Sequence, residues 1–213
     1  MKILAVSSSP RKDSNSGLLA QAVLDGAASR GHSTELVHLT DTVTAPLRDC
    51  RSCRQDDGTC SIEDNYEQLV LQKVLSADAI VFATPLYWYG MSGQLKIFID
   101  RLFCYIKSDY PDCESVREQL VGKRMVVTIS SEESYPGAVS SIVAQMQEFA
   151  RYLHSDLVGV VRGIGNTRGE VEHDPSRPLD QAHDLGTRLF EERYTDYRID
   201  TPRSGVVWPV PLG

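Results

Sequence analysis

The segment Ala79–Arg101, AIVFATPLYWYGMSGQLKIFIDR, changes its hydrophobic period halfway along and so decides the fold. Its first six residues, Ala79–Thr84, are mostly apolar, as in a strand buried on both faces of a sheet. Pro85 follows directly and, because it has no N–H group, is expected to stop the hydrogen-bonded ladder of that strand. From residue 95 onward the apolar residues recur at helical spacing, and Ser92 stands where it can cap the helix. The segment therefore predicts a buried strand, a loop and an amphipathic helix.

The same alternation runs along most of the chain. Further strands are predicted at residues 3–7, 33–39, 125–129 and 157–161, and amphipathic helices at 19–27, 66–75, 139–153 and 182–189. Parallel strands need crossover connections of helical length. Five strands alternating with five helices therefore predict an α/β fold, a doubly wound five-stranded parallel sheet with helices on both faces.

The chain has 213 residues, a length that suits one hydrophobic core, and we expect a single domain over residues 1–193. Residues 194–213 show no period but contain the mostly apolar run VVWPV at 206–210. Such side chains are unfavourable in water, so this C-terminal arm is expected to pack on the domain or on a partner subunit.

Charge and cysteine content narrow the class of protein. The chain has 22 basic and 29 acidic residues, a formal net charge of -7, which disfavours nucleic acid and anionic membranes as main partners. The apolar run at residues 3–6 is shorter than the about 7 to 15 residues of a signal peptide, and no run approaches the roughly 18 of a membrane span. We expect a cytoplasmic protein whose five cysteines are thiols or ligands rather than disulfides.

A serine-rich stretch, Ser7–Ser16 (SSSPRKDSNS), follows the first predicted strand. In a doubly wound sheet, ligands bind outside the carboxyl ends of the strands, near the point where the strand order reverses. The N–H groups and dipole at the start of the next helix favour a phosphate there, and serine and asparagine side chains add donors. The alternative is a serine-rich turn with a helix cap, and composition does not separate the two. The stretch lacks the glycine spacing of a dinucleotide fingerprint.

Three aromatic residues, Tyr87, Trp88 and Tyr89, follow the third predicted strand and precede Gly90. If exposed, they form an apolar patch that calls for a flat ring or a subunit interface beside it. The alternative is an aromatic cluster buried beneath a loop. The serine-rich stretch at the neighbouring strand end favours the interpretation as a ligand site.

Together, SSPRKDSNS at residues 8–16 and TPLYWYGMSGQLKIFIDR at 84–101 resemble the NADPH-dependent FMN reductase family. This flavodoxin-like group includes quinone reductases and iron-sulfur flavoproteins, and the similarity runs from Met1 to about Arg162. The resemblance implies a flavodoxin-like fold, FMN as cofactor, NADPH or NADH as electron donor, and a homodimer or homotetramer. Because the flavin carries the hydride chemistry, no catalytic side chain is expected.

The resemblance also assigns site residues. Those that match the phosphate-binding positions are Ser9, Arg11, Ser14, Asn15 and Ser16. Those that match the loop along the isoalloxazine ring are Pro85, Leu86, Tyr87, Trp88, Tyr89 and Gly90, of which the three aromatic residues would also shape the face where substrate stacks. Ser130 and Ser131, placed after the fourth predicted strand, match a third loop near the flavin.

Residues 50–66, CRSCRQDDGTCSIEDNY, resemble the loop that supplies four thiolates in the iron-sulfur members. Here the thiolates would come from Cys50, Cys53 and Cys60, with Asp56 where a third cysteine is expected. Three thiolates and a carboxylate match the usual Cys₄ ligation of such clusters poorly. A zinc site with Asp56 or Asp57 as oxygen ligand is an alternative. We expect no metal and interpret these cysteines as remnant or structural.

The remaining features are interpreted as structural. Residues 163–169 are expected to form a loop, and 170–174 a solvated loop. Cys104 is predicted on a helix and Cys113 in a loop, neither with a catalytic role. Taken together, these observations predict an FMN-dependent oxidoreductase that passes hydride from NAD(P)H through FMN to a quinone-like or other conjugated small-molecule acceptor. The alternatives are a flavodoxin-type electron carrier, an iron-sulfur flavoprotein relative, and a member that has lost FMN and binds a partner protein.

Overall fold

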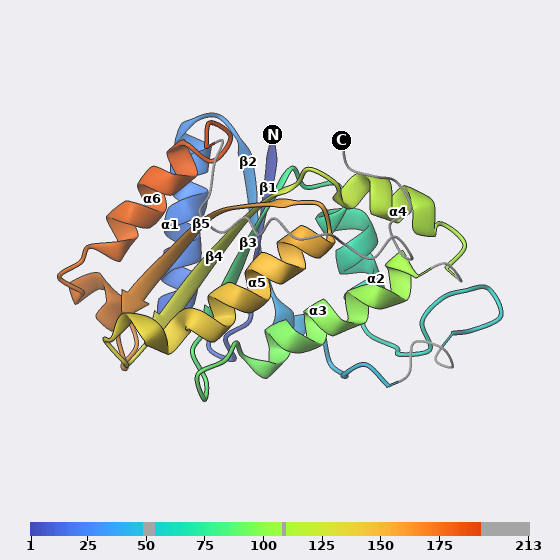
Figure 1. Ribbon diagram of the computed structural model, residues 1–213, viewed down its shortest axis with the longest axis horizontal. Helices are drawn as coiled ribbons and strands as arrows, with labels where there is room; N and C mark the ends of the chain where they lie inside the picture. The colour runs from blue at the N-terminus through green and yellow to red at the C-terminus, as the bar shows by residue number, and fades with distance from the viewer. Residues whose placement is uncertain (49–53, 108–109, 193–213) are drawn as a thin grey trace.

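The computed structural model describes residues 1–48, 54–107 and 110–192 (Figure 1). Within these residues, five parallel strands form one sheet in the order β2-β1-β3-β4-β5. The strands are β1 (Lys2–Ser7), β2 (Ser33–His38), β3 (Ala79–Pro85), β4 (Arg124–Ser131) and β5 (Asp156–Ile164). This order confirms the predicted doubly wound sheet and is the flavodoxin-like one, with its switch point between β1 and β3.

Helices cover both faces of the sheet (Figure 1). One face carries α1 (Asn15–Ser29) and α6 (Pro178–Thr187). The other face carries α2 (Tyr66–Gln68) with the π-helix Leu69–Val74, then α3 (Gly93–Ile106), α4 (Cys113–Leu120) and α5 (Ser140–Tyr152). Short 3₁₀ turns lie at Leu39–Asp41, Pro136–Val139 and Glu170–His173.

Strand β3 explains why the core has two layers. Successive side chains of a strand point to opposite faces of a sheet. Ile80 and Phe82 therefore pack with α3 and α5, whereas Ala79 and Val81 pack with α1 and α6. Every residue of β3 is buried, as its mostly apolar sequence predicted.

Two glycines allow α1 and α6 to approach closely. A Cβ atom on Gly26 would lie 2.1 Å from the carbonyl oxygen of His183, and one on Gly186 would lie 2.1 Å from that of Val23. Either atom would collide with backbone, which cannot yield as a flexible side chain can. The two helices thus pack backbone to backbone, a contact that helical periodicity could not predict.

The expectation that Pro85 stops the ladder of β3 is wrong. Pro85 pairs with Ser130, and the next residue, Leu86, donates its N–H to the Ser130 carbonyl over 2.8 Å. Alternate residues of a strand direct their N–H groups to opposite neighbours, so the N–H that Pro85 lacks would face β1. Strand β1 pairs with β3 only as far as Ala83, so no bond is lost. Ser130 and Ser131 accordingly lie inside β4 rather than after it.

The predictions of a loop at Cys113 and of a solvated loop at residues 170–174 are also wrong in part. Cys113 is buried and begins helix α4, an element that the sequence analysis missed because its eight residues carry few apolar side chains. Residues 170–174 are not solvated throughout, since Val171 and Asp174 are buried. The Asp174 carboxylate accepts hydrogen bonds from the backbone N–H groups of Ile164 and Ser176, over 2.6 and 2.9 Å. Burial raises the pKa of Asp174, but these bonds outweigh it and hold the pKa below its ordinary value.

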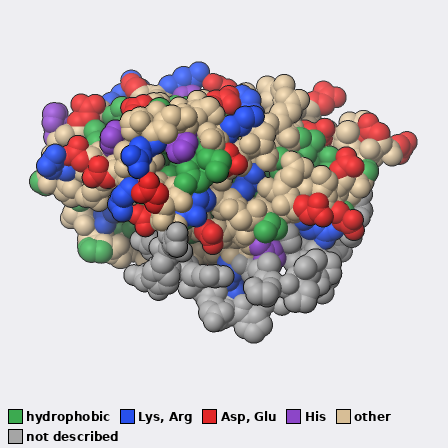
Figure 2. All heavy atoms as spheres, turned by 90° about the horizontal axis from the view of Figure 1, so that it is seen from above, with side chains coloured by type: hydrophobic (Ala, Val, Ile, Leu, Met, Phe, Trp, Pro, Cys, Tyr) green, Lys and Arg blue, Asp and Glu red, His purple; other side chains and the backbone are tan. Residues whose placement is uncertain are grey.

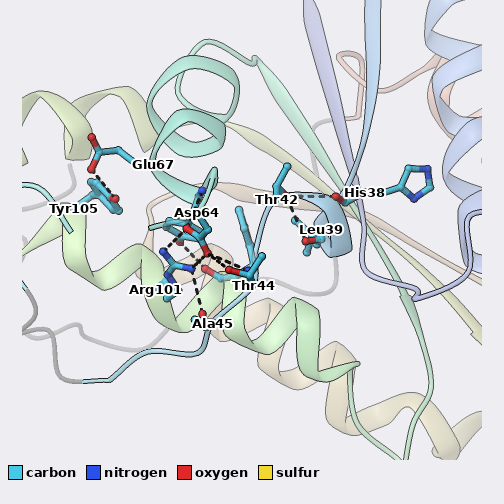
Figure 3. Close-up of polar contacts among 11 residues, drawn as sticks. His38, Leu39, Thr42, Thr44, Ala45, Asp64, Glu67, Arg101 and Tyr105 are labelled. Carbon is cyan, nitrogen blue, oxygen red and sulfur yellow. Dashed lines mark hydrogen bonds and ion pairs between the residues drawn. The ribbon is translucent and has the colours of Figure 1, made fainter. Parts of the chain in front are cut away.

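A buried ion pair joins α3 to the segment before α2 (Figure 3). The Arg101 and Asp64 side chains are only 1% and 2% exposed, and Arg101 Nη2 donates to Asp64 Oδ1 over 2.8 Å. The Arg101 guanidinium also donates to the Ala45 carbonyl over 3.1 Å and lies 4.2 Å from the ring centre of Tyr66. Asp64 further accepts from the Thr44 backbone N–H over 3.0 Å. These contacts therefore join Thr44 and Ala45, which precede residues 49–53, to Asp64, which follows them.

Cys50, Cys53 and the C-terminal arm predicted at residues 194–213 lie outside the described residues. Among the described residues, no helix is both long and apolar enough to cross a membrane. Figure 2 looks onto the end of the molecule where Figure 1 places the N-terminus, and acidic and basic side chains are intermixed there. The strands run away from that end, so the predicted site residues belong to the opposite edge of the sheet.

Candidate functional site

The candidate site lies at the carboxyl edge of the sheet, where the chain leaves β1, β3 and β4. From β1 the chain passes to α1 on one face, and from β3 it passes to α3 on the other. Adjacent strands whose connections leave in opposite directions create a crevice between them. The predicted phosphate and ring loops are the two loops at this crevice.

The stretch Ser7–Ser16, called the serine loop below, ends in the cap of α1. Ser14 Oγ accepts the N–H of Gly17 over 3.1 Å, and the Ser14 carbonyl accepts that of Leu18 over 2.9 Å. The first N–H groups of a helix have no partner inside it. The N–H groups of Asn15 and Ser16 thus remain as donors at the helix start, and the helix dipole adds positive potential there. The predicted cap and the predicted anion site therefore coincide.

Ser7, the last residue of β1, adds a donor that the sequence analysis missed. Its side chain is fully buried, and its hydroxyl has no hydrogen-bond partner within the described part of the chain. The Ser7 oxygen is 3.8 Å from the point that a Cβ on Gly17 would occupy, which places it beneath the start of α1. A buried hydroxyl without a partner is unfavourable unless a ligand satisfies it. The donors here fit a phosphate group, such as that of FMN.

The side chain of Asn15 is already engaged. Its amide nitrogen donates to the carbonyls of Gly165 and Thr167 over 3.1 and 2.9 Å, and its oxygen accepts the N–H of Val171 over 3.4 Å. This side chain fastens the loop after β5 to the start of α1. In this arrangement Asn15 can offer a phosphate its backbone N–H rather than its amide.

The other predicted phosphate ligands lie in the same serine loop. Ser9, Ser14 and Ser16 are buried, and Ser9 Oγ accepts the backbone N–H of Arg11 over 3.2 Å. The Arg11 side chain is exposed, so its guanidinium is accessible from solvent. The serine loop thus combines buried hydroxyls with an accessible guanidinium.

Residues Tyr87–Gly90 form a two-residue hairpin turn, called the aromatic hairpin below. The N–H groups of Tyr87 and Gly90 bond to each other's carbonyls over 2.9 and 3.0 Å. Trp88 and Tyr89 have φ angles of 49° and 59°, as a type I′ turn requires at both central positions. That turn normally takes Asn-Gly, because bulky residues are strained at positive φ. Strain of this kind is typical of functional sites.

The aromatic hairpin is exposed, so the alternative of a cluster buried beneath a loop is wrong. Trp88 is 97% exposed, and Tyr87 and Tyr89 are about half exposed. A hydrogen-bonded chain ties the hairpin to the serine loop. Ser92 Oγ donates to the Ser8 carbonyl over 3.2 Å, and the Ser92 N–H donates to Thr84 Oγ1 over 3.0 Å. The same Ser92 oxygen accepts the N–H of Leu95 over 3.3 Å, which confirms Ser92 as the cap of α3.

The third predicted group lies beside the hairpin. Ser130 and Ser131 are buried, and the Ser130 carbonyl accepts the Leu86 N–H immediately before the hairpin. Tyr135, four residues beyond Ser131, was not predicted. Its phenol contacts that of Tyr89, and its pKa is raised by partial burial and then by the charge of Tyr89 and a hydrogen bond to it. The structure thus brings all three predicted groups to one edge of the sheet and adds Ser7 and Tyr135.

No group of three or more His, Cys, Asp or Glu side chains within residues 1–48, 54–107 and 110–192 could hold a metal ion. Cys60 is half-buried, and Cys104 and Cys113 are buried. The prediction that the loop at 50–60 binds no metal stays a prediction, because two of its cysteines lie outside the described residues.

Comparison with known proteins adds independent findings. A family model described as NADPH-dependent FMN reductase matches residues 1–161. An iron-sulfur flavoprotein of Methanocaldococcus jannaschii is 37% identical over 101 residues, which are 47% of this chain and 51% of that protein. The chain therefore spans about half the length of this relative. A Bacillus subtilis protein, named as a candidate NAD(P)H-dependent FMN-containing oxidoreductase, is 27% identical over 175 residues, 82% of this chain and 91% of that protein.

Among solved structures, the NAD(P)H:quinone oxidoreductase of Methanothermobacter marburgensis superimposes with a TM-score of 0.65 at 20% identity. The superposition covers 92% of this chain and 98% of that one. At this identity the likeness establishes the shared fold.

Proposed function

The chain belongs to the NADPH-dependent FMN reductase family, and on that premise we propose that it passes hydride from NAD(P)H through bound FMN to a quinone-like or other conjugated acceptor. One observation carries the proposal. A serine loop suited to a phosphate and a strained, exposed aromatic hairpin lie at neighbouring strand ends and are joined through Ser92. Two such loops side by side suit a ligand with a phosphate at one end and a flat ring at the other.

The serine loop would hold the phosphate of FMN. The proposed side chains are Ser7, Ser9, Arg11, Ser14 and Ser16, with the backbone N–H of Asn15. Hydroxyl and N–H donors at a helix start bind an anion without bringing a bulky group near it. Arg11 adds positive charge beside the phosphate in a protein of net negative charge.

The remaining predicted residues would hold the ring. They are Pro85, Leu86, Tyr87, Trp88, Tyr89 and Gly90, with Ser130 and Ser131 at the end of β4. Bound FMN would supply the chemistry, accepting a hydride from the nicotinamide and giving two electrons to the acceptor. The protein's own part is to bind and orient, so we propose no catalytic side chain. The three aromatic side chains would form the surface on which the nicotinamide and the acceptor stack in turn.

An anaerobic absorbance titration tests the proposal. Purified protein, loaded with FMN, is titrated with NADPH and then, in a fresh sample, with NADH. We expect near-stoichiometric bleaching of the flavin band with at least one nucleotide, followed by recovery of the band when menadione is added. Bound flavin that neither nucleotide reduces would favour the electron carrier, and absence of flavin binding would refute the cofactor assignment. Extra broad visible absorbance before FMN is added would indicate an iron-sulfur cluster.

The two adjacent serines Ser7 and Ser8 provide a matched test of the phosphate assignment. The Ser8 hydroxyl donates to the Ala83 carbonyl over 2.7 Å, whereas that of Ser7 has no partner among the described residues. Ser8→Ala should lower the free energy of unfolding of the apoprotein by about 1 kcal/mol, and Ser7→Ala should leave it unchanged or slightly higher.

FMN affinity should depend on the Ser7 hydroxyl, although the stability of the apoprotein does not. Ser7→Ala should weaken FMN binding about tenfold, the loss of one hydrogen bond to a charged group. Quenching of flavin fluorescence measures the affinity, and denaturant unfolding measures the stability. Equal FMN affinity in the wild type and Ser7→Ala would exclude Ser7 from the phosphate site.

The proposal extends to assembly and location. We propose a homodimer or homotetramer in the cytoplasm, on the sequence grounds given above. Light scattering measures the mass in solution and distinguishes both assemblies from a monomer.

A further inference from the structure

Arg162, on the edge strand β5, reaches across to the segment that follows β4. Its Nε donates to Ser131 Oγ over 3.0 Å, and its Nη1 donates to the Tyr135 carbonyl over 2.9 Å. Its Nη2 donates to the carbonyl of Glu133. One guanidinium thus bonds to three positions of the segment Ser131–Tyr135, called the rim segment below. The sequence analysis assigned no role to this arginine.

The rim segment places Tyr135 beside the aromatic hairpin. The Tyr135 and Tyr89 phenols are in contact, although Tyr135 is still 52% exposed. The Tyr135 ring also lies 3.5 Å from the point that a Cβ on Gly137 would occupy. Ser141, at the start of α5, donates its hydroxyl to the Tyr89 carbonyl. Residues that follow β4 therefore contact both the side chain and the backbone of Tyr89 in the hairpin.

We propose that Arg162 is a positioning residue, which holds the rim segment so that Tyr135 and Tyr89 together form one wall of the surface on which the electron acceptor stacks. The identity of the ligand rests on the proposed function, whereas the contact between the two tyrosines does not. A guanidinium suits this role because its planar fork of donors can serve three acceptors at once. A lysine ammonium at the same position is a point donor and cannot reach all three in the same geometry.

A tyrosine contact can be measured without cofactor. In the apoprotein with isotopically labelled tyrosine, we expect a nuclear Overhauser effect between the rings of Tyr89 and Tyr135, assigned with Tyr135→Phe. Arg162→Ala should abolish this signal, and Arg162→Lys should weaken it. Persistence of the full signal in Arg162→Ala would overturn the positioning role, whatever the outcome of the flavin titration.

Steady-state kinetics of the FMN-loaded enzyme with menadione test the link to the acceptor. Arg162→Ala and Tyr135→Ala should each raise the KM for menadione about tenfold, as expected when one aromatic contact is lost. For Tyr135→Ala, FMN affinity should stay within about twofold of the wild type, since the serine loop, Ser130 and Ser131 are all unchanged. An unchanged menadione KM, or an equal loss in every parameter, would overturn the proposal.

Arg124 provides the matched control. It lies at the first residue of β4, and its Nε donates to the Leu189 carbonyl over 2.6 Å, at the opposite end of the strand from Ser131. Arg124→Lys should leave both the tyrosine contact and the menadione KM unchanged. If Arg162→Ala does not fold, Arg162→Lys and Tyr135→Ala decide between the same two outcomes.

Discussion

Arg101→Met is expected to lower the free energy of unfolding by about 3 to 5 kcal/mol, because Asp64 would keep a buried charge without its partner. Both side chains are almost fully buried, and the guanidinium also bonds to the Ala45 carbonyl. Methionine fills much of the same volume, so the loss would come from the unpaired carboxylate rather than from a cavity. Urea unfolding of the apoprotein, followed by circular dichroism, measures the effect.

The same helix holds a matched control. Lys96 and Asp100 form an ion pair one turn apart on α3, but their side chains are 53% and 38% exposed. Lys96→Met should change the free energy of unfolding by no more than about 1 kcal/mol, since exposed pairs contribute little. Adding Asp64→Asn to Arg101→Met should recover much of the loss, because it removes the unpaired charge. Equal effects of Arg101→Met and Lys96→Met would refute the assignment of Arg101 as a stabilising partner.

Acid should weaken the same contact. Burial raises the pKa of Asp64, but hydrogen bonds from Arg101 and from the backbone N–H groups of Thr44 and Tyr66 outweigh it, and the pKa is lowered from 3.8. A carboxyl group whose pKa is lower in the folded state stabilises the protein above its ordinary pKa and loses that contribution as pH falls through the lowered value. The stability advantage of the wild type over Asp64→Asn should therefore be constant near neutral pH and shrink below pH 3.8.

Replacing Trp88–Tyr89 by Asn-Gly should reduce kcat/KM for menadione by roughly 100-fold, as expected when two aromatic stacking contacts are lost. This substitution removes the two rings without disturbing the backbone of the turn. Asn-Gly is the preferred pair for a type I′ turn, so the backbone of the aromatic hairpin should keep its shape and lose its strain. The free energy of unfolding should stay equal or rise, and FMN should remain bound through the serine loop.

A second variant separates the effect of the aromatic rings on activity from the effect of the backbone conformation. Trp88→Phe combined with Tyr89→Phe keeps two aromatic rings and the strained turn, and it should retain most of the activity. Steady-state kinetics with menadione and flavin fluorescence compare the two variants. Full turnover by the Asn-Gly variant would show that these rings do not shape the substrate surface.

The success and failure of the sequence predictions have identifiable physical causes. The strand at Ala79–Thr84 and the cap at Ser92 were predicted correctly, because hydrophobic period and capping depend on neighbours a few residues away. Helix α4 was missed because eight residues carry too little pattern to separate a helix from a loop. Pro85 was misjudged because the effect of its missing N–H depends on which neighbouring strand that group would face.

The sequence by itself determined that strands and helices alternate, that the sheet is parallel, and that a serine-rich stretch and an aromatic stretch follow two of its strands. These features follow from local periodicity and loop composition, which depend only on residues close together in the chain. Only the tertiary structure decided that Ser7 lacks a partner, that Asn15 bonds to residues 150 and 152 positions away, and that Arg162 sets the segment beside Tyr89. Hydrogen-bond partners far apart in the chain meet only after folding, and no local pattern identifies them.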